Sequence, residues 1–434
     1  MSKSEWYADF VKLGYAPKKD DIVCLFRFEP SSGIADSEAM GRIASESSVG
    51  TWTTLAALPK MLPKLKAYAF WNDRNFCKVA YPGALFEPAS ITGFLAGPAG
   101  NIFGMKAIKN LRLIDVEFPR HYVRQFRGPH FGIDAIKKIF KKKSGPITAV
   151  VPKPKLGYTA TEHAEKVAYA VWRGGIDCVK DDENLTNQAF NKFGERVNRL
   201  SRVRDRVEKE TGEVKEAFIN VTAPDLRELE KRIKVVHEHG FRYFMLDVVI
   251  SGFAAVQTAS NIAHDYEMAI HAHRAMHAMF TRNRRHGMSM LLLAKLMRLI
   301  GVDQLHIGTA IGKLEGSRSE IIATKDMVLS REVGEIPMSR LHQDWNGIKP
   351  MLPVASGGLH PGLLPHVFDI YKTTDMVVQV GGGTQGHPMG IEAGAKAVVQ
   401  AIEAYHHKVN LYEYGETHME LKEALKKWGS VRPR

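Results

Sequence analysis

A lysine and three acidic residues stand together in the segment GGIDCVKDDE, residues 174–183. Alternate side chains of an extended chain point to the same side, which places Lys180 beside Asp182, and Glu183 can join them where the strand gives way to a loop. Carboxylate oxygens are the ligands that Mg²⁺ prefers, whereas a protonated lysine repels a metal. Addition of CO₂ to the neutral amine would turn Lys180 into a carbamate anion and supply a third anionic ligand. A lysine that merely neutralises nearby acids is the plainer interpretation, and the residues alone leave both open.

Two further groups of polar residues could act on an anionic substrate. Lys153 and Lys155 in KPKLG are two residues apart, so an extended chain holds them on one side. The alternative is a pair of exposed lysines whose stems cover apolar surface. The run HAHRAMH, residues 271–277, offers His271, His273, Arg274 and His277. In isolation this run is either an ordinary polar cluster or a zinc-like set.

Glycine-rich turns form a third group. In IGTAIGKLEG, residues 307–316, Gly308 and Gly312 are the expected pivots for loop motion, and a surface loop with a solvated Lys313 is the alternative. The turns ASGG (355–358) and VGGG (380–383) let backbone N–H groups approach a phosphate closely. One such turn is more often structural, but two in succession match a known phosphate arrangement of barrel enzymes.

Short apolar runs precede most of these residues and alternate with helical patterns. The runs are ITAVV (147–151), IDCVK (176–180), AFINV (217–221), YFMLD (243–247), MAIHA (268–272), QLHIG (304–308), LPVAS (352–356) and MVVQV (376–380). Amphipathic stretches such as AEKVAYAVWRG and LRELEKRIKVVHEHG lie between them, which is the pattern of βα units. Eight such units predict a (β/α)₈ barrel, in which chemistry collects where the strands end.

The first part of the chain has a different pattern. Strand-like segments, residues 22–30 and 66–82, flank the helical stretch DSEAMGRIASESS, which is typical of an α+β domain. We therefore expect an N-terminal α+β domain over residues 1–125. An α/β domain, a (β/α)₈ TIM barrel with C-terminal helices, is expected over residues 126–434.

Composition limits the classes of partner. A formal net charge of +13 over 434 residues suits nucleic acid, a membrane surface or an anionic substrate. The basic residues are spread out with no aromatic-interleaved basic motif, which favours solvated faces and phosphate ligands over nucleic acid. No run approaches the roughly 18 apolar residues that span a bilayer and the start lacks a signal core, so we expect a cytoplasmic protein without a membrane partner. Cys24, Cys77 and Cys178 indicate neither a disulfide framework nor a thiolate zinc site.

The motifs resemble the large subunit of ribulose-1,5-bisphosphate carboxylase/oxygenase (RuBisCO) along nearly the whole chain. In the order of that family they are ESSVGTWTT (46–54), GNIFGMKAIKNLRL (100–113), KPKLG (153–157), GGIDCVKDDEN (174–184), HAHRAMH (271–277), HIGTAIGKLEG (306–316), ASGGLHPG (355–362) and QVGGGTQGHP (379–388). The chain length, the sequence GVDQLHIGTAIGKLEG and the lack of a long insertion after it resemble the archaeal form III branch. Val151 departs from the threonine of plant-type enzymes, and Ile307 is a second departure.

The resemblance implies an activity and its catalytic residues. It implies a Mg²⁺-dependent carboxylase that adds CO₂, or O₂ in competition, to the enediolate of ribulose 1,5-bisphosphate and yields 3-phosphoglycerate. In that family the lysine matched by Lys180 is carbamylated by CO₂ and binds Mg²⁺ with the residues matched by Asp182 and Glu183. The other catalytic residues carried over are Lys153, a proton donor or acceptor at carbon 2, Lys155, which orients it, His273, an acid/base near the metal, Lys313, which stabilises developing charge, and Glu46.

The resemblance also implies two phosphate sites, and hence a bisphosphate substrate. One phosphate is assigned to Arg274, whose guanidinium fork suits its oxygens, with His306 and Ser356. The other is assigned to Gly358, Gly381, Gly382, Thr51, Trp52 and Lys313, and Gly357 and Gln379 belong to the same substrate-binding turns. Glu46, Thr51, Trp52 and Asn101 match residues that complete the partner subunit's active site. A homodimer or a ring of dimers is therefore expected, with no small subunit.

Two rival functions remain at this point. A RuBisCO-like enolase or isomerase shares the barrel and the carbamate but lacks part of the carboxylation set. The residues retained here that argue against it are Lys153, His306, Lys313, Ser356 and Glu46. A basic barrel that binds nucleic acid would use the +13 charge, and would bind with a strong salt dependence and without turnover of a bisphosphate.

Overall fold

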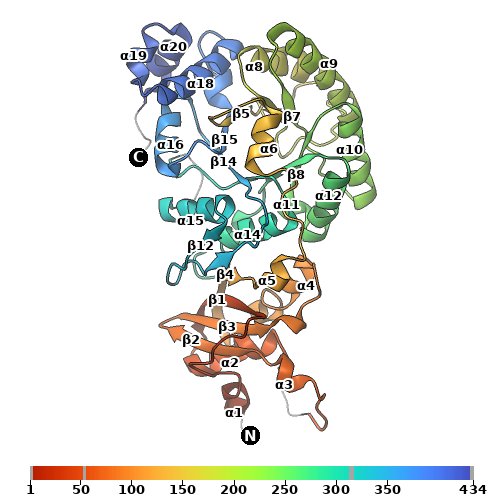
Figure 1. The fold of residues 1–434 in the computed structure, drawn as a ribbon, viewed down its shortest axis with the longest axis vertical. Helices are drawn as coiled ribbons and strands as arrows, with labels where there is room; N and C mark the ends of the chain where they lie inside the picture. Colours follow the sequence, from red (N-terminus) through yellow and green to blue (C-terminus); the bar gives the residue numbers. More distant parts are fainter. Residues whose placement is uncertain (1–2, 52–54, 312–316, 431–434) are drawn as a thin grey trace. The chain divides into compact units, whose positions relative to one another are not determined.

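The computed structural model describes residues 3–51, 55–311 and 317–430. Within it the chain divides into two compact units. The first comprises Met1–Gly128, Met276–Ile300 and Ser330–Ile348, and the second comprises Pro129–Ala275, Gly301–Leu329 and Lys349–Arg434. Figure 1 follows the elements of both units along the sequence.

A five-stranded sheet in the order β10-β4-β1-β3-β2 forms the centre of the first unit. Its strands are β1 (Asp21–Pro30), β2 (Tyr68–Asp73), β3 (Phe76–Pro82), β4 (Ile108–Glu117) and β10 (Gly287–Met288). Helix α2 (Asp36–Glu46) buries Met40 and Ile43 and packs on β2 and β3, as an α+β domain requires. The unit also holds α1 (Lys3–Ala8), α3 (Leu62–Leu65), η1 (Gly83–Leu85), α4 (Ile91–Ala96), η2 (Asn101–Gly104), α5 (Arg120–Val123), α13 (Ala278–Thr281), α14 (Met290–Ile300) and the pair β12 (Glu332–Val333) and β13 (Gln343–Asp344).

A buried ion pair fastens α14 to this sheet. Lys295 of α14 lies 2.7 Å from Asp115 of β4, and both side chains are fully buried. Lys295 also donates to the carbonyl of Val116, and Asp115 accepts the backbone N–H of Leu341. These bonds satisfy both charges, so residues far apart in the sequence form one packed unit.

Eight parallel strands form the barrel of the second unit, in the order β7-β6-β5-β15-β14-β11-β9-β8. They are β5 (Ile147–Val150), β6 (Cys178–Lys180), β7 (Glu216–Phe218), β8 (Tyr243–Asp247), β9 (Ala269–His273), β11 (Gln304–His306), β14 (Leu352–Ser356) and β15 (Val377–Val380). Hydrogen bonds from Met245 N to Ile219 O and from Val221 N to Met245 O, 2.8 and 2.9 Å long, join β7 to β8. Each strand overlaps one of the eight apolar runs, so the predicted fold class is confirmed.

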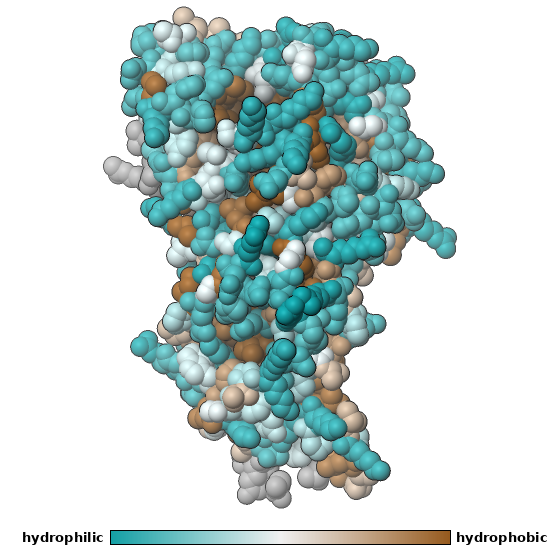
Figure 2. Space-filling model, in the orientation of Figure 1, coloured by the Kyte–Doolittle hydropathy of each residue, from teal (hydrophilic) through white to brown (hydrophobic). Residues whose placement is uncertain are grey.

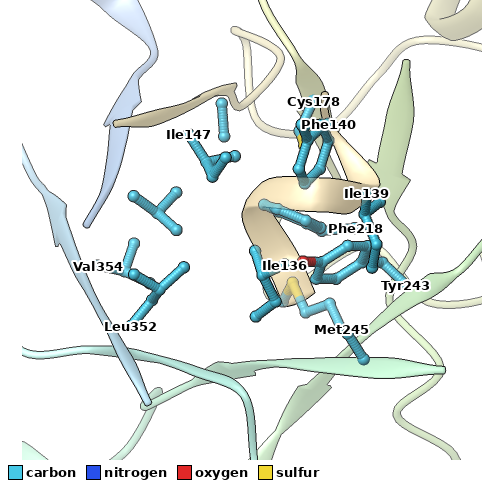
Figure 3. Close-up of a cluster of buried hydrophobic side chains, with 13 residues drawn as sticks. Ile136, Ile139, Phe140, Ile147, Cys178, Phe218, Tyr243, Met245, Leu352 and Val354 are labelled. Atoms are coloured by element: carbon cyan, nitrogen blue, oxygen red, sulfur yellow. The ribbon is translucent and has the colours of Figure 1, made fainter. Parts of the chain in front are cut away.

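Apolar side chains fill the barrel interior near the amino ends of the strands. Helix α6 (Gly132–Ile139) directs Ile136 and Ile139 into this cluster, and Phe140 follows it (Figure 3). Their partners from the strands are Ile147, Ala149, Cys178, Phe218, Tyr243, Met245, Ala269, Leu352, Val354 and Val377. Because alternate strand residues point inward, every strand that contributes two residues contributes them two apart.

Helices lie outside the strands, as Figure 1 shows for α8, α9, α10 and α12. The helices of the second unit beyond α6 are α7 (Ala160–Glu162), the π-helix η3 (His163–Ala168), α8 (Tyr169–Arg173), α9 (Phe193–Thr211), α10 (Leu226–Glu238), α11 (Val248–Ser251), α12 (Phe253–Asp265), α15 (Arg318–Leu329), η4 (Pro361–Leu363), α16 (Leu364–Tyr371), α17 (Gly382–Gln385), α18 (Ile391–His406), α19 (Leu411–Gly415) and α20 (Met419–Trp428). Asp225 caps α10 through the N–H of Glu228, and Gly212 ends α9 in the left-handed conformation.

Polar residues cover most of the face drawn in Figure 2, and the hydrophobic areas on it are small and scattered. Across the described parts of the chain, none of the helices combines the length and the apolar character that a bilayer crossing needs. The three cysteines are buried free thiols.

Candidate active site

The carboxyl ends of the barrel strands carry most of the polar residues that the sequence singled out. Lys153 and Lys155 follow β5, Lys180 ends β6, and Asp182 and Glu183 come directly after it. The others in this unit are His273 and Arg274 at the end of β9, His306 at the end of β11, Ser356, Gly357 and Gly358 at the end of β14, and Gln379, Gly381 and Gly382 at the end of β15. In a parallel barrel these ends meet at one mouth.

Two lysines share two carboxylates at this mouth. The Nζ atoms of Lys153 and Lys155 each lie 3.6 Å from Oδ2 of Asp182, and Lys155 is 2.6 Å from Oε1 of Glu183. The Lys155 ammonium therefore bridges both acids, which shows that one cation can reach the two carboxylates together. Neighbouring lysines and His273 outweigh the effect of burial and hold the pKa of Glu183 at about 2, so this carboxylate is charged at neutral pH.

Lys180 is 1% exposed and donates to the backbone carbonyl of Asp181 at 2.8 Å. Burial lowers its pKa, although the surrounding carboxylates oppose that shift. A lowered pKa makes the neutral amine more available, and the neutral amine is the form that adds CO₂. With a carbamate on Lys180, this lysine, Asp182 and Glu183 are the groups that could hold a hard divalent cation.

The two lysines after β5 differ in their surroundings. Burial lowers the pKa of Lys153, and the adjacent Lys155 charge acts in the same direction against the attraction of Asp182. For Lys155 burial also acts to lower the pKa, but the hydrogen bond to Glu183 and the two acids outweigh it, and the net pKa is raised. Lys153 is therefore the better placed of the two to exchange a proton near neutral pH.

A chain of hydrogen bonds fixes the histidines behind the mouth. Nδ1 of His271 lies 2.9 Å from Oε1 of Gln304, its Nε2 lies 2.9 Å from Nε2 of His306, and Nδ1 of His306 lies 2.8 Å from Oγ of Ser356. The amide oxygen only accepts, so Nδ1 of His271 carries a proton, and Nε2 of His306 must then donate. The hydroxyl of Ser356 consequently donates to His306. Burial lowers the pKa of both rings well below the usual value, which keeps them neutral.

Arg274 is a buried cation, 6% exposed. Among the described residues it forms no ion pair with a carboxylate. Burial lowers its pKa to about 10. Gly308, with φ +105°, lies against it, because a Cβ there would stand 3.3 Å from a guanidinium nitrogen. A buried guanidinium that forms no ion pair with the described carboxylates suits an anionic ligand.

The two glycine turns give the backbone room at the mouth. Gly357 and Gly358 have φ values of +109° and +77°, which disfavour other residues. A Cβ on Gly381 would lie 3.1 Å from Cε of Lys153, so this turn packs closely on the catalytic candidate. Oε1 of Gln379 is buried without a partner among the described residues. Such a polar atom is costly unless a ligand or water satisfies it.

Some predicted residues are not part of this cluster in the described second unit. Glu46 ends α2 and Asn101 opens η2 in the first unit, and both are exposed. Thr51 is half-buried in the same unit. His277 also belongs to the first unit, where Nδ1 lies 2.8 Å from the Thr281 hydroxyl. Trp52 and Lys313 lie outside the described residues.

Several polar residues near the mouth were not selected from the sequence. His271 was noticed without an assigned role, and Asp181, Asn220, Asp247 and Gln304 were not selected. Asp247 closes the apolar run YFMLD, and Asn220 stands in AFINV. A polar residue at the carboxyl end of a predicted barrel strand was a usable signal in both cases.

Comparison with known proteins finds one family that matches both parts of the chain. Residues 9–122 match the N-terminal domain of the ribulose bisphosphate carboxylase large chain, and residues 132–428 match its catalytic domain. The protein named ribulose bisphosphate carboxylase from Pyrococcus abyssi is 49% identical over 436 residues, covering 100% of this chain and 99% of the relative. The corresponding protein of Archaeoglobus fulgidus is 48% identical and covers 100% of both chains.

Solved structures give the same result. The dimeric archaeal Rubisco from Hyperthermus butylicus superposes with a TM-score of 0.93 at 49% identity, covering 98% of this chain and 100% of that one. The octameric enzyme from Pyrococcus horikoshii superposes with a TM-score of 0.91 at 48% identity, covering 99% and 98%. With both domains matched and nearly half of the residues identical over the full length, this chain belongs to the ribulose bisphosphate carboxylase large-chain family.

Proposed function

We propose that this protein is a ribulose 1,5-bisphosphate carboxylase that adds CO₂ to the enediolate of its substrate and yields 3-phosphoglycerate. The observation that carries the proposal is the convergence of Lys153, Lys180, Asp182 and Glu183 at one mouth, in a chain 49% identical to a protein named ribulose bisphosphate carboxylase. O₂ competes for the same enediolate. The relatives support a place in the archaeal form III branch.

Lys180, as its CO₂ carbamate, would hold Mg²⁺ together with Asp182 and Glu183, and a cation held there would supply the Lewis acidity that polarises a substrate carbonyl and stabilises enediolate charge. Lys180 is suited to this role because burial favours its neutral form. Lys155 holds the two carboxylates in place before the carbamate forms, since its Nζ contacts both.

Lys153 donates and accepts the proton at carbon 2, and Lys155 keeps it oriented. His273 acts as an acid/base beside Glu183, from which its Nε2 is 3.8 Å away. Lys313 stabilises the carboxylate that forms when CO₂ adds.

Arg274, His306 and Ser356 bind one phosphate. The Arg274 guanidinium, which forms no ion pair with a described carboxylate, supplies the charge. For His306 or Ser356 to donate to the phosphate, the hydrogen bonds that these two groups make within the histidine chain must open when the substrate binds. The glycine turns at Gly358, Gly381 and Gly382 bind the other phosphate with Thr51, Trp52 and Lys313. Gly357 and Gln379 complete the substrate-binding turns, and the amide oxygen of Gln379, which has no partner among the residues described, accepts a substrate hydroxyl.

The catalytic unit is a homodimer or a ring of dimers without a small subunit, and in support of this two similar solved structures are dimeric and octameric. Glu46 and Asn101 then act in the active site of the partner subunit. Mixing inactive Glu46→Gln and Lys180→Met enzymes under subunit exchange restores activity, because one site of each mixed dimer contains both native residues. No recovery despite proven exchange contradicts the shared site.

The decisive test is fixation of ¹⁴CO₂ with ribulose 1,5-bisphosphate and Mg²⁺ after preincubation with CO₂. The expected product is acid-stable label in 3-phosphoglycerate. Isomerisation or enolisation of a sugar phosphate without incorporation of label favours the RuBisCO-like rival. Binding of nucleic acid with a steep salt dependence and no turnover favours the basic barrel.

A further inference from the structure

The carboxylate of Asp247 lies behind the mouth and has no role in the proposed mechanism. It ends β8 and is 1% exposed. Its Oδ1 lies 3.0 Å from Nδ1 of His273, and its Oδ2 accepts from Nδ2 of Asn220 and from the hydroxyl of Thr222, both at 3.3 Å. The Thr222 hydroxyl also accepts the backbone N–H of Asp247 at 3.0 Å. Both carboxylate oxygens and the backbone N–H of Asp247 therefore have a protein partner.

Nδ1 of His273 has two competing neighbours. Asp247 offers an acceptor at 3.0 Å, and the backbone N–H of Ala275 points at the same nitrogen from 3.2 Å. Oδ2 of Asp247 already receives two donors, an arrangement that fits a charged carboxylate. A charge-assisted bond at the shorter distance is the stronger of the two, so Nδ1 carries the proton. Nε2 lies 3.8 Å from Oε2 of Glu183, too far for a hydrogen bond to that carboxylate, and keeps its lone pair.

Asn220 connects this pair to the carboxylate segment. It is fully buried, and its Nδ2 lies 3.2 Å from the carbonyl of Glu183 and 3.4 Å from that of Asp182 as well as 3.3 Å from Asp247. Its backbone N–H donates to Oδ2 of Asp181 at 3.0 Å. One side chain thus contacts both the backbone that carries the proposed metal ligands and the acid behind the histidine.

The far side of this network is anchored on a helix. Arg196 of α9 is fully buried and donates through Nε to Asp181 at 3.0 Å. The same guanidinium donates to the carbonyl of Thr186 at 2.8 Å. The segment after β6 is therefore fixed from outside the barrel by Arg196 and from the neighbouring strand by Asn220.

We propose that Asp247 is a positioning residue: it fixes the tautomer of His273 with the proton on Nδ1 and aims Nε2 at the mouth, while Asn220 ties it to the segment that carries Asp182 and Glu183. Its kinetic consequence rests on the proposed function. The tautomer itself is a property of the folded chain and does not depend on that function.

Nitrogen NMR of the full-length protein labelled with ¹⁵N-histidine measures the tautomer directly. His273→Ala identifies the His273 signals by their loss. We expect a protonated Nδ1 and an unprotonated Nε2 in the native protein, and a shift toward protonated Nε2 in Asp247→Asn. Asp303→Asn is the matched control, because Asp303 is a buried carboxylate at the amino end of a barrel strand. We expect it to leave the His273 signals unchanged. A native ring protonated on Nε2, bonded by the Ala275 N–H, overturns the proposal.

A double-mutant cycle then tests the kinetic consequence. Removing a group that orients an active residue typically costs about 10- to 100-fold in activity, so we expect that loss in kcat for Asp247→Asn with little change in KM. In a His273→Ala background the same substitution should cost less than about threefold, because Asp247 acts through that ring. Equal losses in both backgrounds refute the positioning role.

If Asp247→Asn does not fold, Thr222→Val replaces it as the test variant. It removes one donor to Asp247 at nearly constant volume, and we expect a smaller loss of kcat that again disappears in the His273→Ala background. An equal loss in that background would refute the proposal as well. If the native enzyme fixes no ¹⁴CO₂, the proposed function fails, while the NMR experiment still decides whether Asp247 sets the tautomer.

Discussion

Two buried lysines at opposite ends of neighbouring barrel strands show how the two ends differ. Lys180 ends β6 and Lys215 precedes β7, each is 1% exposed, and each donates to a backbone carbonyl, at 2.8 and 3.0 Å. The Nζ of Lys215 also forms an ion pair with Oε2 of Glu213 at 2.6 Å. Lys180 lies among carboxylates that Lys153 and Lys155 already share.

The same contrast holds for the acids. At the amino ends, Asp177 accepts from the N–H and hydroxyl of Thr148, and Asp303 accepts the N–H groups of Phe131 and Ile270. At the mouth, Arg274 has no carboxylate partner among the described residues. The acids at the amino ends are therefore hydrogen-bonded within the fold, whereas the buried Arg274 at the mouth is left to pair with a ligand.

The largest effect expected from this contrast is on catalysis. Lys180→Met should lower ¹⁴CO₂ fixation by more than about 10³-fold, because the lysine belongs to a set that acts as a unit. Lys215→Met should keep most of the activity and lower the free energy of unfolding by about 1–3 kcal/mol, since it leaves a buried carbonyl without a donor. Radiometric assays and denaturant unfolding of both variants check this. An active Lys180→Met enzyme would contradict the proposed division between the two ends.

A second comparison uses two buried arginines. Arg196→Met removes the partner of Asp181 and should cost about 3–5 kcal/mol in unfolding free energy. Arg274→Met removes a cation that pairs with no carboxylate in the described parts of the chain, so stability should hold while KM for the bisphosphate rises by about 10²-fold or more. Chemical denaturation and steady-state kinetics separate the two. A strongly destabilised Arg274→Met with unchanged KM would show that this arginine is structural.

The acids at the amino ends predict a pH effect on stability. Burial raises the pKa of Asp303 to about 6, against the usual 3.8, so the folded state binds the proton more tightly than the unfolded state. The unfolding free energy should therefore fall as pH rises between about 4 and 6, by up to about 3 kcal/mol from this group. Asp303→Asn should flatten that slope. Urea unfolding across this pH range measures the slope for both proteins. An identical slope of unfolding free energy against pH would contradict the raised pKa of Asp303.

The smallest expected effect concerns Val151, which is 6% exposed just after β5. Val151→Thr adds a hydroxyl at the mouth and should alter the ratio of carboxylation to oxygenation by less than about tenfold, the scale of one hydrogen bond. Competition of ¹⁴CO₂ against O₂ measures the ratio. A Val→Thr change at a buried position of β4 in the first unit, Val116, should alter stability but leave the ratio as it is.

The sequence predicted the barrel because each strand run contains its own periodicity and ends in polar residues. It brought Lys180, Asp182 and Glu183 together for the same reason, since alternation along one strand is local. It missed Asp247 and Asn220 as partners, because their hydrogen bonds depend on how β6, β7 and β8 align around the barrel. The packing of α14 on β4 was equally inaccessible, since the Lys295–Asp115 pair joins positions far apart in the chain.

Helix α6 helps to fill the amino end of the barrel with apolar side chains. Its Ile136 and Ile139 fill the inner space at the amino ends of the strands, so we expect substrates and products to enter and leave at the carboxyl ends. Substrate entry and product release then use the same end of the barrel and cannot be changed independently. A substitution that widens this end of the barrel to speed product release should also admit more water to the reactive enediolate. Side reactions with water therefore limit how fast product can be released.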